Sequence, residues 1–350
     1  MLARRGIGRT APNPSVGCVI VKNGIVVGQG RTADGGRPHA EQIALKEARA
    51  AAKDATAYVT LEPCAQNTET PSCAQSLIDA GVKRIVVAVQ DPDHRTDGNG
   101  IAMLRSSGAV VETGLLDKAA TEILGGFLTR ITKGRPAVTL KIAQSLDGKT
   151  ATAAGESKWI TGEAARRFGH LLRAGHDAIL IGINTVLKDD PELTCRLPGL
   201  ERFSPVRVVL DTELKFPEGC KLMRSARDVP VIVYTAATGG AVLKAKGIEV
   251  VKVQKDARGR PDVAAVLADL GNRGFNNLLV EGGATVHASF LDRGLADRLE
   301  VFTAPMALGA AGQGAVEALA VLGLDEASRF CRVDIRKLGP DLLESFTLKA

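Results

Sequence analysis

Short apolar runs and longer amphipathic stretches alternate along the first part of the chain. The runs are bounded by turn-forming residues and predict strands over residues 16–21, 25–29, 56–61, 84–89 and 109–113. The stretches between them are rich in helix-forming residues and predict helices over residues 40–52, 73–80, 100–107 and 117–132. Two strands followed by alternating helices and strands, with short connections, predict a three-layer α/β domain.

The sequence Lys133-Gly134-Arg135-Pro136 interrupts this pattern. Glycine and proline break regular structure, so we expect a boundary between domains of residues 1–133 and 134–350. The length of 350 residues suits two domains of roughly 100–200 residues each. Beyond the break, the pattern predicts strands over residues 137–143, 178–181, 206–210, 229–234 and 278–280. It also predicts helices over residues 163–174, with Thr161 as the N-cap, and 262–270.

A glycine pair follows the strand at 278–280, in the turn Glu281-Gly282-Gly283, and a helix then extends to Leu291. Backbone N–H groups at such a turn can bind an anion, for which a nucleotide phosphate is the obvious candidate. The alternative is that the glycines only permit a tight turn. No Gly-x-Gly-x-x-Gly opens a βαβ unit, so a Rossmann dinucleotide domain is not supported. The glycine-rich stretch 309–314 lacks this context, and we expect a mobile loop there.

His39, Cys64 and Cys73 form a candidate metal site in the first domain. One imidazole and two thiolates leave a position of a tetrahedral zinc ion open for water, as in catalytic zinc sites. Zinc lowers the pKa of such a water from about 16 to near 7. Glu41 can then carry the proton to a departing amine, as in the zinc deaminases, whose cysteines are usually closer together in sequence. A structural zinc site, or cysteines that merely pack, is the alternative.

Composition limits the remaining classes of function. Hydrophobic residues make up 45% and charged residues 24% of the chain, as in soluble globular proteins. No apolar run is long enough to span a membrane, and the N-terminus lacks the apolar core of a signal peptide. We therefore expect a cytoplasmic protein with reduced cysteines, of which four are interpreted as packing residues: Cys18, Cys195, Cys220 and Cys331.

The net charge of +6 is spread along the chain, and aromatic residues make up only 3% of it. A nucleic-acid-binding stripe with stacking aromatic residues is therefore not visible, whereas a small phosphorylated substrate fits. In the loop at residues 10–17, two prolines flank Asn13, whose amide suits the edge of a heterocyclic base. The alternative is that Asn13 is an ordinary turn residue.

Further motifs accompany the metal-site residues in order along nearly the whole chain. In the first domain they are Pro12-Asn13-Pro14-Ser15-Val16-Gly17, His39-Ala40-Glu41, Thr60-Leu61-Glu62-Pro63-Cys64, Cys73 and Gln90-Asp91-Pro92. In the second they are Lys141 and residues 145–148, 155–161, 172–174, 185–187, 189–191, 193–196 and 281–283. Together they resemble the bifunctional deaminase–reductases of riboflavin biosynthesis.

The resemblance implies a cytidine-deaminase-like α/β domain followed by a dihydrofolate-reductase-like α/β domain. It implies hydrolytic deamination of a diaminopyrimidinone that carries a ribosylamino 5′-phosphate, and then reduction of the ribosyl group to ribityl by NADPH. Zinc would be held by His39, Cys64 and Cys73, with Glu41 as the catalytic proton carrier. The implied NADPH contacts are Ala143, Trp159, Thr185, Asp189, Thr212, Gly283, Ala284, Thr285, Val286, His287, Ala288 and Ser289. The expected substrate contacts are Ser157, Arg173, Leu193, Arg196 and Glu281, with Asn13 in the first domain.

Two features depart from the family pattern. Between the cysteines, a basic residue that helps to hold the substrate phosphate is replaced by Glu69. An acid ~5 Å from a phosphate dianion is unfavourable by up to several kcal/mol, so either another cation takes over or the deaminase is weak. Candidates for such a cation are Lys46, Lys53 and Lys83, but the sequence does not show whether any of them lies near the substrate phosphate. The helix that usually precedes the Pro-Asn-Pro loop is represented only by residues 2–5, as a truncation or a misassigned start would produce.

Three hypotheses follow. The first is a bifunctional deaminase and reductase, which we expect to be a homo-oligomer without nucleic-acid or membrane partners. The second is a reductase alone, with a structural zinc in an inactive deaminase domain. The third is a deaminase or binding module for nucleic-acid bases, which the missing aromatic platform and the whole second domain oppose.

Overall fold

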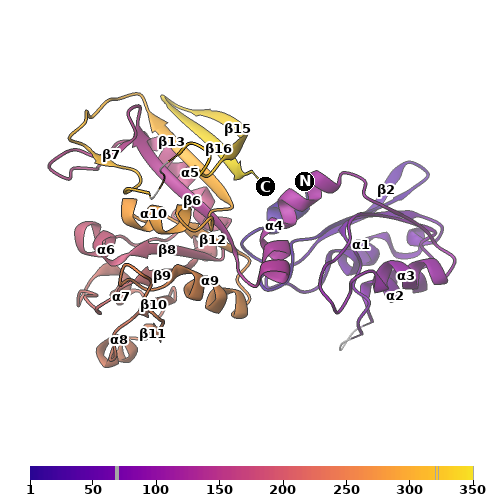
Figure 1. Ribbon diagram of the computed structural model, residues 1–350. Coiled ribbons are helices and arrows are strands. Elements are labelled where there is room, and N and C mark those ends of the chain that lie inside the picture. The colour runs from indigo at the N-terminus through magenta and orange to yellow at the C-terminus, as the bar shows by residue number, and fades with distance from the viewer. Residues whose placement is uncertain (68–70, 320, 322, 350) are drawn as a thin grey trace. The chain divides into compact units, whose positions relative to one another are not determined.

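The computed structural model describes residues 1–67, 71–319, 321 and 323–349 (Figure 1). The chain divides into two compact units. The first comprises Met1–Arg135 with Gly271–Asn276, and the second comprises Pro136–Leu270 with Asn277–Ala350. Both units are mixed α/β folds, as the sequence predicts. Glu69 lies outside the described residues.

A five-stranded sheet with the order β2-β1-β3-β4-β5 forms the centre of the first unit. Its strands are β1 (Gly17–Lys22), β2 (Ile25–Arg31), β3 (Thr56–Leu61), β4 (Arg84–Val89) and β5 (Val110–Thr113). Its helices are α1 (Ala40–Ala48), α2 (Cys73–Asp79), α3 (Asn99–Ser106) and α4 (Asp117–Lys133). β1 is antiparallel to β2 and β3, whereas β3, β4 and β5 are mutually parallel.

The predicted order of strands and helices in the first unit is confirmed. The hairpin between β1 and β2 turns at Asn23 and Gly24, whose φ angles of 51° and 77° are the left-handed values that such a turn requires. The helix predicted over residues 40–52 is shorter, because Arg49 has a φ of 50°. The chain continues from there as a 3-10 turn over Arg49–Ala52.

Strand β4 shows that this sheet is covered on both faces. Ile85, Val86 and Val87 are all buried, although successive side chains of a strand point to opposite faces. Helices α1, α2 and α3 contact one another in succession, and α4 packs against β4. Leu124 and Phe127 of α4 belong to the same hydrophobic core. The three-layer α/β prediction is therefore confirmed.

Helix α1 lies directly on the backbone of β2. A Cβ atom added to Gly30 would lie 2.4 Å from the carbonyl oxygen of Ala40, and one added to Gly28 would lie 2.2 Å from that of Ala44. Any side chain at these positions would push the helix outward. Because α1 begins immediately after His39, this close approach also fixes the position of that histidine.

The second unit contains a nine-stranded sheet with the order β11-β10-β9-β8-β12-β6-β13-β16-β15. Its strands are β6 (Ala137–Ser145), β8 (Ala178–Gly182), β9 (Val206–Leu210), β10 (Val231–Thr235), β11 (Glu249–Lys252), β12 (Asn277–Val280), β13 (Arg298–Ala304), β15 (Phe330–Leu338) and β16 (Asp341–Leu348). A separate two-stranded sheet consists of β7 (Lys149–Ala151) and β14 (Gln313–Gly314). The helices are α5 (Glu163–Ala174), α6 (Ile183–Asp189), α7 (Lys221–Arg224), α8 (Ala241–Ala245), α9 (Val263–Asn272) and α10 (Ala284–Leu291).

The strands from β11 to β13 in this order are all parallel, and β16 and β15 extend the sheet antiparallel. The chain starts at β6, continues through β8 to β11 on one side, and returns with β12 between β8 and β6. Parallel strands end at a common edge, and ligands bind there where the strand order reverses. Ser145, Glu281 and Ile183 end or follow β6, β12 and β8, so they belong to this edge.

Two local predictions in the second unit are wrong. The loop predicted over residues 309–314 ends at residue 312, because Gln313 and Gly314 pair with β7; Asp147 also accepts N–H groups from Leu308 (3.1 Å) and Gly309 (2.7 Å). The partners are too distant in sequence for local patterns to reveal this pairing. The N-cap of α5 is Gly162, rather than Thr161.

Three of the four cysteines interpreted as packing residues are buried, but Cys331 on β15 is exposed, so that interpretation is wrong for Cys331. β15 is the outer strand of the sheet and has one neighbouring strand, which explains the exposure. In the part of the chain that the structure describes, no helix combines the length and apolar character needed to cross a membrane.

We predict that Gly30→Ala destabilises the first unit by about 1–3 kcal/mol, the usual effect of overpacking, because α1 must move away from β2. Thermal and urea unfolding would measure the change. Gly125→Ala in α4 is the matched control, since an added Cβ there meets nothing within 4 Å. This control should be neutral or stabilising by up to about 1 kcal/mol. Equal stability of the Gly30→Ala variant and wild type would contradict the close approach.

Candidate functional site

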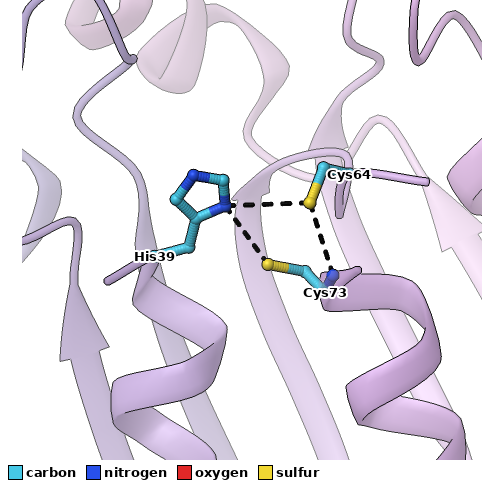
Figure 2. A group of neighbouring side chains, drawn as sticks. All are labelled: His39, Cys64 and Cys73. Carbon is cyan, nitrogen blue, oxygen red and sulfur yellow. Dashed lines mark hydrogen bonds between the residues drawn. The ribbon is translucent and has the colours of Figure 1, made fainter. Parts of the chain in front are cut away.

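Three side chains from separate elements of the first unit meet in one cluster (Figure 2). His39 is the N-cap of α1, Cys64 follows β3, and Cys73 begins α2. Nδ1 of His39 lies 3.3 Å from Sγ of Cys73 and 3.7 Å from Sγ of Cys64. The three potential ligand atoms all lie within 4.8 Å of one another. The spacing in sequence therefore corresponds to proximity in space.

The start of α2 holds the two sulfur atoms together. The hydroxyl of Ser72 caps the helix by accepting the N–H of Gln75 at 3.2 Å. The N–H of Cys73 donates to Sγ of Cys64 at 3.3 Å. This arrangement turns both thiol groups toward the same imidazole nitrogen (Figure 2).

The donor set fits a zinc ion. The hydrogen bond from the Cys73 thiol lowers the pKa of Cys64 to about 4, and His39 acts in the same direction. The pKa of Cys73 is raised because its thiol donates a hydrogen bond to Sγ of Cys64 and because the thiol is buried. Nitrogen and sulfur ligands of this kind are those that Zn²⁺ selects. Three of them leave room for a fourth ligand from solvent or substrate.

Glu41 lies in the first turn of α1 and is 3% exposed. Burial raises the pKa of its carboxyl group to about 7, although the charge of His39 and hydrogen bonds, including one with the Cys73 thiol, oppose this. A carboxyl group with a pKa near neutrality can both accept and donate a proton. The geometry therefore sets a buried carboxyl group beside the candidate metal cluster.

Glu62 is a structural residue of this centre that the sequence reading missed. Its buried carboxylate accepts N–H groups from Asp91 (3.2 Å), Gly98 (3.1 Å) and Ile101 (3.1 Å). Because Glu62 stands two residues before Cys64, these bonds fix the cysteine loop to the segment between β4 and α3. Its sequence signals are an acidic residue at the end of an apolar strand and its place in the motif Thr60-Leu61-Glu62-Pro63-Cys64, neither of which reveals its role as an anchor.

A cavity of about 140 Å³ lies beside the cluster. The polar residues that line it are Asn13, Thr32, Arg37, His39, Glu41, Glu62, Cys64, Gln66, Asp91, Asp93, Arg95 and Thr96. The side-chain amide of Asn13 donates to the carbonyl of Gly36 at 2.9 Å, so this amide also fixes a wall of the cavity. None of the three lysines considered from the sequence is among the described lining residues, whose cations are arginines.

In the second unit, a cleft of about 1040 Å³ lies at the edge where the parallel strands end. Ten residues predicted to contact NADPH or substrate line it: Ala143, Ser157, Trp159, Thr185, Asp189, Glu281, Gly283, Ala284, Thr285 and His287. The glycine turn joins β12 to α10, with Gly283 as the N-cap. The predicted strand–turn–helix arrangement is therefore present, and ligand contacts of these residues remain predictions.

A cluster of charges lies at the base of this cleft. Nε and Nη2 of Arg173 donate to the carboxylate oxygens of Glu281 at 2.7 and 2.9 Å. Nζ of Lys141, which was not among the predicted site residues, lies 3.7 Å from the same carboxylate. Burial alone would raise the pKa of Glu281, but the charges of Arg173 and Lys141 outweigh it and lower the pKa to about 2. Glu281 is therefore ionised at neutral pH.

Several residues that were predicted to contact ligands are not among the residues that line this cleft. Arg173 is paired with Glu281, Leu193 is buried, and Nη1 of Arg196 donates to Glu192 at 3.0 Å. The others are Thr212, Val286, Ala288 and Ser289. Val286 and Ala288 are buried within α10. Their contacts with cofactor or substrate remain predictions.

The outer wall of the cleft carries an exposed aromatic side chain. Trp159 is 68% exposed, and the guanidinium carbon of Arg166 lies 4.6 Å from the centre of its ring. Beside it, Nζ of Lys158 lies 3.4 Å from the carboxylate of Asp189. A flat ring and a mixed-charge rim suit a ligand that combines an aromatic ring with phosphate groups.

Two family models match this chain. Residues 2–89 match the cytidine and deoxycytidylate deaminase zinc-binding region, which includes His39, Cys64 and Cys73. Residues 136–343 match the RibD C-terminal domain. The riboflavin biosynthesis protein RibD of Aquifex aeolicus is 40% identical, over 99% of this chain and 95% of the relative. That of Bacillus amyloliquefaciens is 42% identical, over 97% and 92%.

Solved structures agree over the full length. Acinetobacter baumannii RibD, form 2, has a TM-score of 0.88 at 36% identity and covers 99% of this chain and 96% of its own. A Thermotoga maritima deaminase/reductase has a TM-score of 0.87 at 34% identity, with the same coverage. With the zinc-binding cluster and the second cleft, these matches show that the chain belongs to the RibD family of riboflavin biosynthesis, bifunctional deaminases and reductases that use Zn²⁺ and NADPH.

Proposed function

We propose that His39, Cys64 and Cys73 hold the catalytic zinc ion and that Glu41 is the proton carrier of the deaminase. The observation that carries this proposal is the meeting of three ligand atoms within 4.8 Å, beside a buried carboxyl group. Residues 1–133 are proposed as the deaminase domain, and residues 134–350 as the reductase domain. The start of the RibD C-terminal match at residue 136 supports this boundary.

The deaminase residues have separate roles. When bound, zinc supplies a Lewis acid that makes water nucleophilic near neutral pH. The carboxylate of Glu41 accepts a proton and returns it to the departing amine, a role that its pKa of about 7 supports. Asn13 contacts the pyrimidine from the wall of the same cavity. The substrate is a phosphorylated diaminopyrimidinone, as the family relationship supports.

The residues of the reductase domain bind the cofactor and the substrate and orient them for hydride transfer. NADPH supplies the hydride, and the protein determines which carbon receives it. Backbone N–H groups at the glycine turn and the start of α10 suit the cofactor phosphates. Glu281 is held rigidly by Arg173 and offers carboxylate oxygens to sugar hydroxyl groups. Ala143 leaves space at the end of β6 for a ring.

The proposed contacts follow the family by position. For NADPH they are Ala143, Trp159, Thr185, Asp189, Thr212, Gly283, Ala284, Thr285, Val286, His287, Ala288 and Ser289. For the reductase substrate they are Ser157, Arg173, Leu193, Arg196 and Glu281. The lining of the cleft supports ten of these positions.

We also propose a cytoplasmic homo-oligomer without nucleic-acid or membrane partners. All six cysteines are free of disulfides, which supports a reducing compartment. The outer strand β15 exposes Val333 and Ile335, 49% and 52% respectively, and an edge strand of this kind can join a second copy. The experiments below distinguish this bifunctional enzyme from the alternative function, a reductase with an inactive deaminase half.

We predict that Cys73→Ala loses the bound zinc, because two ligands hold the ion much more weakly than three. Elemental analysis of freshly purified protein would measure zinc per chain. Cys18→Ala is the matched control, since Cys18 is also fully buried in the first unit but lies outside the cluster. Zinc retained in Cys73→Ala, or lost equally in both variants, would contradict the assigned ligands.

We predict that Glu41→Gln lowers the rate of ammonia release by roughly 100- to 10 000-fold, because the amide cannot carry the proton. Zinc content and NADPH-dependent reduction of the deaminated substrate should be unchanged. Ammonia release and NADPH absorbance would be followed separately. Wild-type protein that releases no ammonia from the phosphorylated pyrimidine would favour the reductase-only alternative.

We predict that Glu281→Gln destabilises the second unit by about 3–5 kcal/mol and impairs reduction, because it leaves Arg173 buried without its carboxylate. Unfolding and NADPH oxidation would be measured. Glu192→Gln is the control, since its pair with Arg196 is exposed and contributes at most about 1 kcal/mol. Ammonia release by Glu281→Gln should match wild type.

The pH dependence of this effect has a definite sign. The folded pKa of Glu281, about 2, lies below its ordinary value of 4.5. Its contribution to stability is therefore complete above the ordinary pKa and is lost as the pH falls toward about 2. The stability difference between wild type and Glu281→Gln should shrink over this range. A difference that grows on acidification would contradict the assigned ion pair.

A further inference from the structure

The cavity beside the zinc cluster has two described cations in its lining, Arg37 and Arg95. Arg37 lies just before α1, and Arg95 lies between β4 and α3. The remaining charged lining groups include the buried acids Glu41, Glu62 and Asp91. A phosphorylated substrate, which the proposed function requires, can therefore bind here only if a cation meets its phosphate.

The guanidinium group of Arg95 is held from one side. Its Nε donates to the carboxylate oxygens of Asp93 at 2.9 and 3.1 Å, and its Nη2 donates at 2.5 Å. The Asp93 side chain is 6% exposed, whereas that of Arg95 is 61% exposed. Among the described residues, Nη1 has no hydrogen-bond partner. The group is thus fixed by a buried acid and keeps N–H donors free for a ligand.

The loop that carries Arg95 is itself attached to the metal site. Nε2 of Gln66, two residues after Cys64, donates to the carbonyl of Arg95 at 2.9 Å. The carboxylate of Glu62 accepts N–H groups from Asp91 and Gly98, which lie on either side of Arg95 in the sequence. These bonds fix the arginine relative to the zinc ligands, so little conformational entropy is lost when it binds an anion.

Arg37 is less suited to this task. Its side chain is exposed and has no hydrogen bond or ion pair among the described residues, so it must be ordered when a ligand binds. Its charge instead acts on His39, where it opposes the rise in pKa that the hydrogen bond with Cys64 causes. It also stands two residues before the zinc ligand His39. The reacting amine must lie near the metal, whereas the phosphate is joined to the ring through a ribosyl group and lies farther away.

We propose that Arg95 binds the phosphate group of the deaminase substrate and that Asp93 is a positioning residue that orients its guanidinium group. This inference rests on the proposed function and adds a residue that determines the preference for a phosphorylated substrate. The cation thus comes from the loop after β4.

The test uses the full zinc-loaded chain and its phosphorylated pyrimidine substrate. Arg95→Gln should raise KM for ammonia release by about 10- to 100-fold with kcat within about threefold, the usual weight of a charge-assisted hydrogen bond. Arg95→Lys should recover part of the loss, and Asp93→Asn should raise KM by a smaller factor. Arg37→Gln, the matched control from the same cavity, should change KM by less than about threefold.

Two further readouts separate phosphate binding from a structural effect. With the dephosphorylated substrate, wild type and Arg95→Gln should have the same KM. The KM of NADPH-dependent reduction should also be unchanged in every variant, because that reaction takes place in the other unit. Zinc content and the unfolding temperature of each variant would be measured alongside.

An unchanged KM in Arg95→Gln, an equal rise in Arg37→Gln, or an equal rise with the dephosphorylated substrate would each overturn the inference. Absence of ammonia release from wild type would instead count against the proposed deaminase activity. In that event, equilibrium binding of the phosphorylated pyrimidine is measured for zinc-loaded wild type and Arg95→Gln, with the reductase cleft filled by the ribityl product. Weaker binding by Arg95→Gln would support the inference. Equal affinities would overturn the inference.

Discussion

The buried carboxylate of Glu62 is the interaction on which the metal-binding half depends. A charged group without partners is costly inside a protein, but Glu62 accepts three backbone N–H groups and is therefore satisfied. It stands between the end of β3 and Cys64. One side chain consequently fixes both the loop of Cys64, a proposed zinc ligand, and the loop that carries Arg95. The candidate metal site and the proposed phosphate-binding loop are therefore both held by Glu62.

The reductase half uses a buried carboxylate in a different way. Glu281 also follows the end of a strand, but its partners are the cations Arg173 and Lys141 rather than backbone groups. Backbone partners anchor a loop, whereas charged side chains keep a carboxylate ionised and orient its oxygens toward a cleft. Similar positions at strand ends thus produce a structural anchor in one unit and a cleft-lining group in the other.

Short sequence patterns were enough to predict much of the fold and of the candidate metal site. The turn Asn23-Gly24, the strand–glycine–helix turn at Gly283 and the order of elements in the first unit follow from short patterns. The metal cluster was predictable from residue types and spacing. Arg95 was missed because its value depends on a folded cavity and on Asp93. The pairing of β7 with β14 was missed because no local pattern joins segments so distant.

That distant pairing has a consequence for how the protein is made. Every side chain assigned to the zinc centre has been synthesised once the ribosome passes Cys73. The wall of the large cleft in the second unit, in contrast, joins Thr150 to Gln313, 163 positions later. Domains generally fold as they emerge, N-terminal first. The three residues of the metal cluster are therefore made long before β14, although the first unit as a whole is complete only once Gly271–Asn276 has been synthesised.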